Sequence, residues 1–121
     1  MKSYELYIDG CWTKSCSNKF FETENPYTGE VWAKISRGNF DDIDKAVRAA
    51  RCAFEGAWGQ VKATERGKLL TKLASLVERD AKKLGEIEVR DNGKLIAEMG
   101  GQTKYLAEWY RYYGGLADKI E

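Results

Sequence analysis

Residues 25–33 read NPYTGEVWA and contain the only proline in a chain of 121 residues. Proline fixes its own φ and keeps the preceding Asn25 out of the helical region, so the stretch begins with a turn. Gly29 can adopt the positive φ that closes such a turn. The alternation of a half-buried strand follows, with apolar side chains at Val31, Ala33 and Ile35. Together with the extended residues 20–23, this stretch predicts a β-hairpin.

A second hairpin is predicted closer to the N-terminus. Residues 4–13 read YELYIDGCWT, and Asp9-Gly10 between two extended runs is a strong signal for a two-residue turn. We therefore expect residues 1–36 to form two β-hairpins. An isolated pair of hairpins is only marginally stable in water, so these strands need another element to pack against.

The hydrophobic period changes to that of a helix after residue 38, so residues 39–121 are expected to be helical. Asn39 is a suitable N-cap for a first helix. The expected inward face of that helix consists of Ile43, Val47, Ala50 and Phe54. A second helix is expected from about Ala63 to Arg79. Its expected apolar stripe consists of Leu69, Leu70, Leu73, Leu76 and Val77.

Two further helices complete the predicted order. Asp80 is expected to cap a third helix with Leu84 and Ile87 inward, which ends at Asn92-Gly93. Gly100-Gly101 is expected to break the chain before a last, strongly aromatic helix. The stripe of that helix is formed by Tyr105, Leu106, Trp109, Tyr112, Tyr113, Leu116 and Ile120. Two hairpins followed by about four helices make an α+β segment without the alternating units of a complete nucleotide-binding sheet.

Composition excludes several classes of function. The 20 basic and 19 acidic residues are interspersed and leave a net charge of +1, so neither nucleic acid nor a membrane surface is an expected partner. No apolar run reaches the length of a membrane span, and the first residues lack the apolar core of an export signal. Three cysteines in no evident framework fit a reducing compartment. We therefore expect a cytoplasmic location.

The residues by themselves reveal no active site. The chain contains no histidine, which removes the commonest general base and metal ligand. Cys11 and Cys16 are too few for a zinc site, and Cys52 has no evident base. The carboxylates of Glu86, Glu88 and Asp91 are more typical of a solvated helix face than of an acid–base pair. The two Gly-Gly pairs belong to no phosphate-binding motif. No catalytic or coenzyme-binding residue is assigned.

Six phrases of the chain, taken in order, resemble the N-terminal quarter of the NAD(P)-dependent aldehyde dehydrogenase superfamily. They are LYIDGCW, NPYTGEVWAKI, DDIDKAVRAARCAFEGAW, ERGKLLTKLASLVERD, EVRDNGKLIAE and WYRYYGGLADKIE. The resemblance implies that residues 1–121 are the N-terminal part of the NAD(P)-binding domain. That part would flank a Rossmann-like sheet built mostly by later residues. The catalytic and oligomerisation domains would be absent from this chain.

The resemblance also implies a reaction for the complete enzyme. Members of this family oxidise aldehydes to carboxylic acids with NAD or NADP, through attack of a cysteine thiolate and a thiohemiacetal, and they form homo-dimers or tetramers. The nucleophile, its glutamate base and the coenzyme-contacting turn lie downstream of the matched region. None of the three cysteines here fits the nucleophile motif, and no coenzyme is expected on the isolated segment. The segment is then scaffold and tunnel wall, with the remainder of the chain as its partner.

Two sets of site residues follow from the resemblance, position by position. Gly101 and Tyr105 align with positions that line the substrate tunnel. Some members bind a structural monovalent cation through a carboxylate at the position of Asp91 and backbone carbonyls near Thr23 and Glu24. The sequence departs from the family at Lys62, where relatives often have a capping residue that Thr64 would replace.

Two other functions remain open at this stage. One is a stand-alone binding module derived from the same family, which would use the aromatic stripe of the last helix. The other is a small enzyme that uses the carboxylates or Cys52. The resemblance to the aldehyde dehydrogenases predicts that the aromatic helix leaves a large exposed apolar patch when the segment stands alone.

Overall fold

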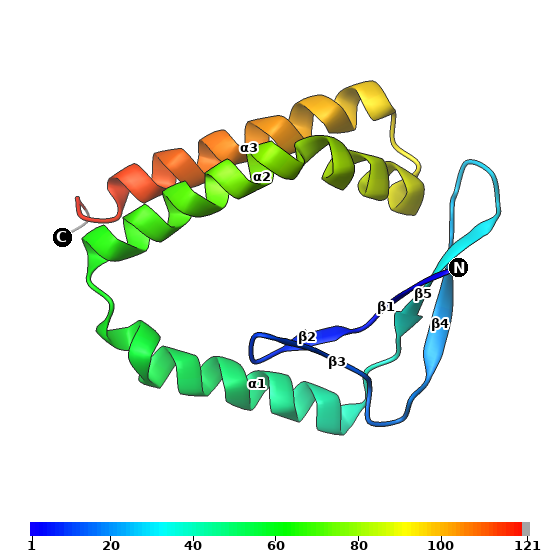
Figure 1. Cartoon of the computed structure of the whole chain (residues 1–121), viewed down its shortest axis with the longest axis horizontal. Coiled ribbons are helices and arrows are strands. Elements are labelled where there is room, and N and C mark those ends of the chain that lie inside the picture. Colours follow the sequence, from blue (N-terminus) through cyan, green and yellow to red (C-terminus); the bar gives the residue numbers. More distant parts are fainter. Residues whose placement is uncertain (120–121) are drawn as a thin grey trace. The chain divides into compact units, whose positions relative to one another are not determined.

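The computed structural model describes residues 1–119, which divide into two units. The first, Met1–Gln60, contains the strands β1 (Lys2–Tyr4), β2 (Leu6–Ile8), β3 (Cys11–Thr13), β4 (Phe20–Glu24) and β5 (Val31–Ser36), followed by the helix α1 (Phe40–Glu55) and the short 3-10 helix η1 (Ala57–Gln60). The second begins at Val61 and contains the helices α2 (Ala63–Asn92) and α3 (Ile96–Leu116) (Figure 1).

Both predicted hairpins are present. β2 pairs antiparallel with β3 through Asp9 and Gly10, whose φ angles of 52° and 77° are the two positive values that a tight hairpin turn requires. β4 pairs antiparallel with β5 around the loop that contains the proline. Gly29 closes that loop with a φ of 70° and donates its backbone N–H to the carbonyl of Asn25 at 2.8 Å.

One strand was not predicted. β1 pairs parallel with β5, which gives a three-stranded sheet of order β1-β5-β4 beside the two-stranded β2–β3 hairpin. Within the central β5, Ala33 is fully buried, and the ring of Trp32 meets that of Tyr4 edge-on at 6.1 Å. A three-residue strand with a distant partner carries no local signal, because its pairing is set by tertiary contact.

The start of α1 is fixed by a polar cluster around Asp42. Asn39 caps the helix as predicted, and its side chain accepts from the backbone N–H of Asp42 in a reciprocal capping box. Asp42 is only 3% exposed. Its carboxylate accepts from the hydroxyl of Ser15 at 2.9 Å and from the backbone N–H of Cys16 at 3.0 Å. These bonds hold the loop between β3 and β4 against the first turn of α1.

The face of α1 that was expected to point inward is exposed. Ile43 is 61% exposed, and Val47 and Phe54 are similarly open to solvent. The side of the helix that packs within the first unit is instead the one that carries Asp42, the only residue of α1 that is buried. The helical period predicted the helix correctly, but no part of the first unit, residues 1–60, covers its apolar stripe.

The second unit corrects two predicted helix boundaries. α2 is continuous for 30 residues, so the expected start of a separate helix at Asp80 is wrong. Asp80 pairs with the neighbouring Arg79 instead. Gly100 and Gly101 lie inside α3 and do not break it. The expected stop at Asn92-Gly93 is confirmed, because Gly93 is left-handed with a φ of 72°. Lys62 stands at the N-cap of α2 without a side-chain cap, and Thr64 does not replace one.

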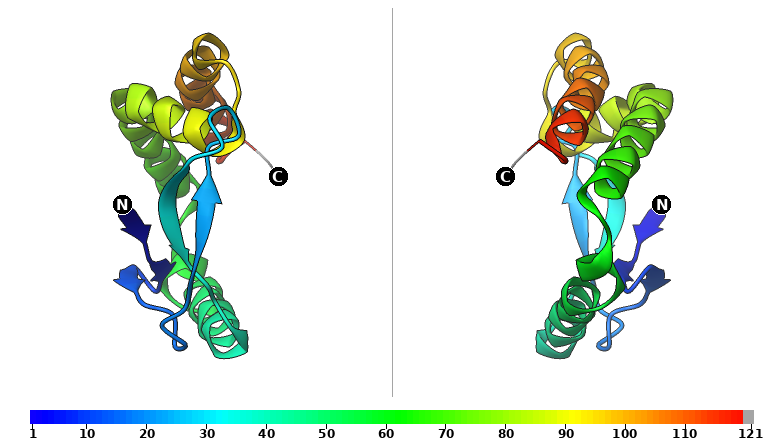
Figure 2. Two further views of the ribbon diagram at one scale, coloured as in Figure 1. Left: turned by 90° about the vertical axis from the view of Figure 1, so that its right-hand side faces the viewer. Right: turned by 90° about the vertical axis from the view of Figure 1, so that its left-hand side faces the viewer.

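α2 and α3 form an antiparallel pair that lies side by side in all three views (Figure 1; Figure 2). The residues buried between them are small on α2 and include one larger side chain on α3: Gly67, Ala74, Ala81 and Gly85 from α2, and Met99, Thr103 and Ala107 from α3. The apolar stripe predicted on α2 is partly exposed: Leu69, Leu73 and Leu76 are each at least 40% accessible, and so is Leu84, which was expected to point inward. The buried positions of α2 are instead small residues, which the hydrophobic period does not mark.

The two backbones are closest near the open end of this pair. A Cβ added at Gly114 would lie 2.9 Å from the carbonyl oxygen of Gly67, and one at Gly67 would lie 2.5 Å from the carbonyl oxygen of Gly114. Only glycine permits such an approach. None of the helices within residues 1–119 combines the length and the hydropathy that a membrane crossing requires.

Gly114→Ala tests this backbone contact. The added methyl group collides with Gly67, so the variant should lose about 1–3 kcal/mol of unfolding free energy, as for an overpacked core. Gly115→Ala is the matched control: nothing lies within 4 Å of its added Cβ. Because alanine favours the helix, the control should gain roughly 1 kcal/mol. Urea denaturation followed by circular dichroism measures both, and equal stabilities would contradict the close approach.

The Asp42 cluster predicts a specific acid sensitivity. Backbone N–H donors from Asn39 and Cys16 lower the pKa of Asp42 below its ordinary value. A lowered folded-state pKa adds stability that is present above the unfolded value of about 4 and is lost as the pH falls toward the folded value. Asp42→Asn should therefore flatten the loss of stability below about pH 4, measured as urea midpoints. Asp44→Asn, which changes a partly exposed carboxylate of α1 that pairs with Arg48, is the control. A wild-type acid slope in Asp42→Asn would refute the role of this group.

Candidate functional site

The two predicted tunnel residues lie on one face of α3. Gly101 and Tyr105 are four residues apart, which places them one above the other on the helix surface. A side chain added at Gly101 would meet open space, and Tyr105 is 60% exposed. The structure therefore places a position without a side chain, Gly101, next to the exposed ring of Tyr105.

Tyr105 belongs to a shallow hollow of about 350 Å³ in the second unit. The other residues that line it are Glu88 from α2 and Gln102, Thr103, Leu106 and Trp109 from α3. Trp109 was not assigned to a site from the sequence. The signal that could have found it is the spacing of four from Tyr105, which repeats again to Tyr113.

These aromatic side chains form a continuous row along α3. The rings of Tyr105 and Trp109 meet edge-on at 6.0 Å, those of Trp109 and Tyr113 stack at 6.3 Å, and those of Tyr113 and Tyr112 meet edge-on at 5.2 Å. Tyr112, Tyr113 and Trp109 are each about half exposed. The expected exposed apolar patch is confirmed for the described residues, while Ile120 lies outside them. Such a row can form an apolar wall and can face a cation.

The predicted cation ligands come from both units. Thr23 and Glu24 end β4, where the register of pairing with β5 shifts. Asp91 is in the last turn of α2. Because each unit is described by itself, this ligand set stays a prediction. Within residues 1–119, no three histidine, cysteine or carboxylate side chains are grouped as a metal site would require.

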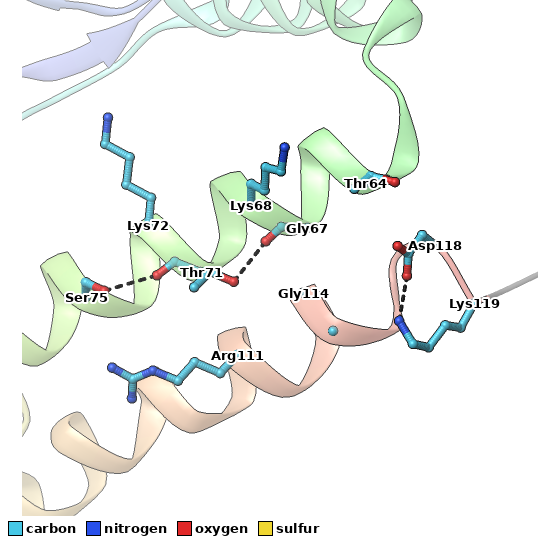
Figure 3. Close-up of a pocket in the computed structure, with 11 residues that line it drawn as sticks. Thr64, Gly67, Lys68, Thr71, Lys72, Ser75, Arg111, Gly114, Asp118 and Lys119 are labelled. Atoms are coloured by element: carbon cyan, nitrogen blue, oxygen red, sulfur yellow. Dashed lines mark hydrogen bonds and ion pairs between the residues drawn. The ribbon is translucent and has the colours of Figure 1, made fainter.

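A second, more polar hollow of about 550 Å³ lies between the start of α2 and the end of α3 (Figure 3). Its lining includes Lys68, Lys72, Arg111 and Lys119. Three of these cations are already paired: Lys68 with Glu65 and Lys119 with Asp118, both at 2.7 Å, and Arg111 with two glutamates. An anion here would have to compete with carboxylates of the chain itself, so the hollow does not define an anion site.

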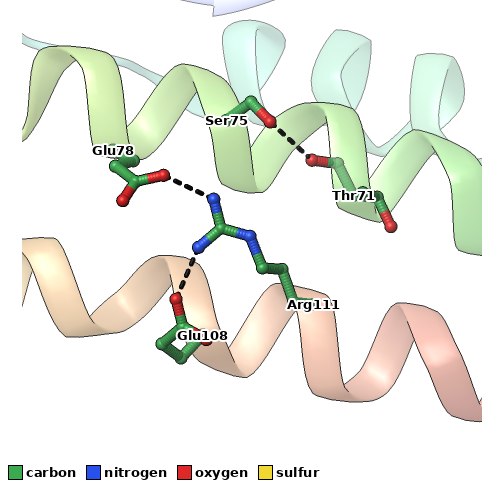
Figure 4. A network of polar contacts seen from close by, with 5 residues as sticks. All are labelled: Thr71, Ser75, Glu78, Glu108 and Arg111. Atoms are coloured by element: carbon green, nitrogen blue, oxygen red, sulfur yellow. Dashed lines mark hydrogen bonds and ion pairs between the residues drawn. The ribbon is translucent and has the colours of Figure 1, made fainter.

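Arg111 joins α3 to α2 through a charged network (Figure 4). Its guanidinium donates to Glu108 on its own helix at 2.5 Å and to Glu78 on α2. The bond from Arg111 lowers the pKa of Glu78, and the pKa of Arg111 is raised by Glu78 and Glu108. The network is a structural link across the helix pair.

None of the shifted carboxyl groups has the properties of a general acid. The pKa values of Asp42, Glu78, Asp80 and Asp118 are all lowered, by hydrogen bonds from backbone amides or from neighbouring cations. A group that donates a proton near neutral pH needs a raised pKa. The carboxylates at Glu86, Glu88 and Asp91 are exposed on α2, as expected for a solvated helix face.

The three cysteines are all exposed. Cys11 begins β3, Cys16 is in the loop between β3 and β4, and Cys52 lies in the last turns of α1. Cys16 is the one with a charged partner, because the ammonium group of Lys45 donates to its sulfur at 3.0 Å. The described residues thus provide an aromatic wall on α3 and a cysteine–lysine pair, without an assembled catalytic site.

Comparison with known proteins gives a consistent result over the whole chain. The model of the Aldehyde dehydrogenase family matches residues 12–121 of this chain. The (Z)-2-((N-methylformamido)methylene)-5-hydroxybutyrolactone dehydrogenase of Acinetobacter baylyi is 47% identical over 122 aligned residues, which cover 100% of this chain and 25% of the relative. An aldehyde dehydrogenase of Aspergillus niger is 49% identical over 115 residues, which cover 95% of this chain and 23% of the relative.

Solved structures agree. An NAD-dependent aldehyde dehydrogenase from Sinorhizobium meliloti superposes with a TM-score of 0.94 at 31% identity, over 100% of this chain and 25% of that one. A betaine aldehyde dehydrogenase from Staphylococcus aureus, solved in complex with NAD+, superposes with a TM-score of 0.92 at 35% identity, over 98% of this chain and 24% of that one. The chain thus spans about a quarter of the length of the relatives it matches.

Proposed function

The chain belongs to the aldehyde dehydrogenase family, and from this premise we propose that it serves as the N-terminal quarter of an enzyme that oxidises aldehydes to carboxylic acids with NAD+ or NADP+. The observation that carries the proposal is the match of essentially the whole chain, in sequence and in fold, to one part of much longer dehydrogenases. The role of the segment itself is structural: it supports the coenzyme domain and contributes to the wall of the substrate tunnel.

The surface of the segment supports this role. Apolar side chains are exposed on the outer faces of α1, α2 and α3, including Ile43, Val47, Phe54, Leu69, Leu73 and Trp109. Exposed apolar area on this scale marks a surface that packs against other protein. We propose that the remainder of a dehydrogenase polypeptide covers these faces, in a homo-dimer or tetramer.

The described residues assign no atom to the coenzyme or to the chemical step. A pyrophosphate site needs a glycine-rich turn between a strand and a helix N-terminus. Here Gly100-Gly101 and Gly114-Gly115 are both inside α3, so neither pair forms such a turn. We propose that the cysteine nucleophile and the residues that choose between NAD and NADP belong to other parts of the enzyme.

The mass and activity of the native protein test the proposal directly. The protein is purified from its source, its intact mass is measured, and aldehyde-dependent formation of NADH or NADPH is followed by absorbance. A mass roughly four times the 13.8 kDa of this chain, with coenzyme reduction, is the expected result. A mass of 13.8 kDa without turnover would instead support a stand-alone binding module that uses the aromatic row.

Tyr105→Ala tests the proposed tunnel wall in the complete enzyme. Loss of the ring removes apolar contact with the substrate in both ground and transition states, so KM for a bulky apolar aldehyde should rise about tenfold, equivalent to about 1.4 kcal/mol, with kcat little changed. Tyr27→Ala is the control, because Tyr27 is 90% exposed at the loop between β4 and β5. An unchanged KM in Tyr105→Ala would remove this residue from the tunnel.

Asp91, with the backbone carbonyls of Thr23 and Glu24, is proposed to hold a monovalent cation. The donors are all oxygen atoms, which suit a hard cation. Sodium or potassium chloride should raise the thermal midpoint of the wild-type enzyme above that in choline chloride of equal ionic strength. Asp91→Asn should lose this difference, while Glu86→Gln, which changes an exposed carboxylate on the same helix, should keep it. An equal cation effect in Asp91→Asn would exclude the site.

A further inference from the structure

Cys16 and Lys45 are 29 residues apart in the chain and in direct contact in the first unit. The Nζ atom of Lys45 donates to the Sγ atom of Cys16 at 3.0 Å. Cys16 is in the loop between β3 and β4, and Lys45 is in the second turn of α1. Both residues are exposed, so small reagents can reach the contact.

The contact is held by the Asp42 cluster. The backbone N–H of Cys16 donates to one carboxylate oxygen of Asp42, and the hydroxyl of the preceding Ser15 donates to the other. Lys45 is one helical turn after Asp42, on the same side of α1. The buried carboxylate thus holds the backbone of Cys16 against the part of α1 that carries Lys45.

The contact with Cys16 and two nearby carboxylates act on the ammonium group of Lys45. The pKa of Lys45 is raised by its hydrogen bond and charge interaction with Cys16, and further by the carboxylates of Asp42 and Asp41. A hollow of about 270 Å³ opens beside Lys45 and is lined also by Asp9, Cys11 and Lys14. A small oxidant such as hydrogen peroxide can reach the sulfur of Cys16 directly from solvent, because Cys16 is exposed.

We propose that Cys16 and Lys45 form a covalent sulfur–nitrogen cross-link when the protein meets a peroxide. In the first step the sulfur attacks one peroxide oxygen, the O–O bond breaks, and the thiol becomes a sulfenic acid while the peroxide is reduced to water. In the second step the neutral amine of Lys45 attacks that sulfur, the S–O bond breaks, and a second water leaves. The sulfur is oxidised by two electrons overall, and the pair loses two hydrogen atoms.

The geometry makes the second step favourable over competing reactions. The amine is already within 3.0 Å of the sulfur, and such positioning converts a bimolecular step into an intramolecular one. The amine that attacks is the deprotonated form of Lys45, which has released its proton to solvent before the S–N bond forms. The product joins the loop after β3 to α1 and constrains the unfolded first unit, as a disulfide would.

The experiment treats the protein with hydrogen peroxide and maps the products by mass spectrometry after tryptic digestion. The expected result is a peptide pair joined at Cys16 and Lys45 that lacks two hydrogen atoms, without cleavage after Lys45. Reduction with dithiothreitol should release it. The thermal midpoint of the first unit should rise on oxidation and return on reduction.

Two variants test whether the cross-link requires the amine of Lys45 or only a positive charge beside the sulfur. Lys45→Arg keeps a cation beside the sulfur but offers no amine that condenses, so oxidation should stop at oxygen adducts of Cys16. Lys14→Arg changes the other lysine at the hollow and should leave the cross-link intact. Cys52, on the exposed side of α1, reports the reactivity of an ordinary thiol in the same sample.

Each alternative product contradicts the proposal. A disulfide between Cys11 and Cys16 would show that a thiol, not Lys45, resolves the sulfenic acid. Oxygen adducts at Cys16 in the wild type without a linked peptide, or a link that persists in Lys45→Arg, would likewise exclude the cross-link. Because the readout is a peptide mass, these outcomes do not depend on aldehyde oxidation or on its failure.

Discussion

The close approach of α2 and α3 is the constraint on which the second unit depends. The backbones meet at Gly67 and Gly114, where any side chain would collide with a carbonyl oxygen. The spacing between two helices is set by the side chains at their contact, so a narrow seam requires small residues along its length. Ala74, Ala81 and Gly85 continue that seam. Since small residues occupy most of the inside, the exposed leucines of α2 and the aromatic row of α3 lie on the outside, while Leu70 stays close to Gly114.

This arrangement explains how a segment with a small core carries so much apolar surface. Met99 is the only large side chain that is fully buried within the described residues. The outer faces of α2 and α3 expose large apolar side chains, as is typical of surfaces that other protein covers. Ile43 and Val47 of α1 are exposed in the same way. A length of about a quarter of the related dehydrogenases agrees with that description. The physical and the comparative observations therefore support the same proposed role as scaffold.

Features set by neighbouring residues could be predicted from the sequence. The turn at Asp9-Gly10, the cap at Asn39 and the stop at Gly93 each depend on a few adjacent positions, and all three are confirmed. The boundary at Asp80 was wrong because a capping residue type does not end a helix that tertiary packing continues. The expectation that Leu84 points inward was wrong for a related reason. Hydrophobic period identifies large apolar side chains, but it gives no weight to glycine and alanine at a close helix crossing.

The candidate sites differ in predictability for the same physical reason. Gly101 and Tyr105 share one helix, so the helical period alone places them on one face. The contact of Cys16 with Lys45 has no such basis, because it depends on Asp42 accepting hydrogen bonds from a loop 26 residues earlier. An aspartate in the first turn of a helix is expected to interact with the helix dipole, and that local role conceals the tertiary one. A buried carboxylate that accepts several hydrogen bonds therefore points to tertiary contacts that sequence patterns do not reveal. In this chain the bonds to Asp42 hold the loop that carries Cys16.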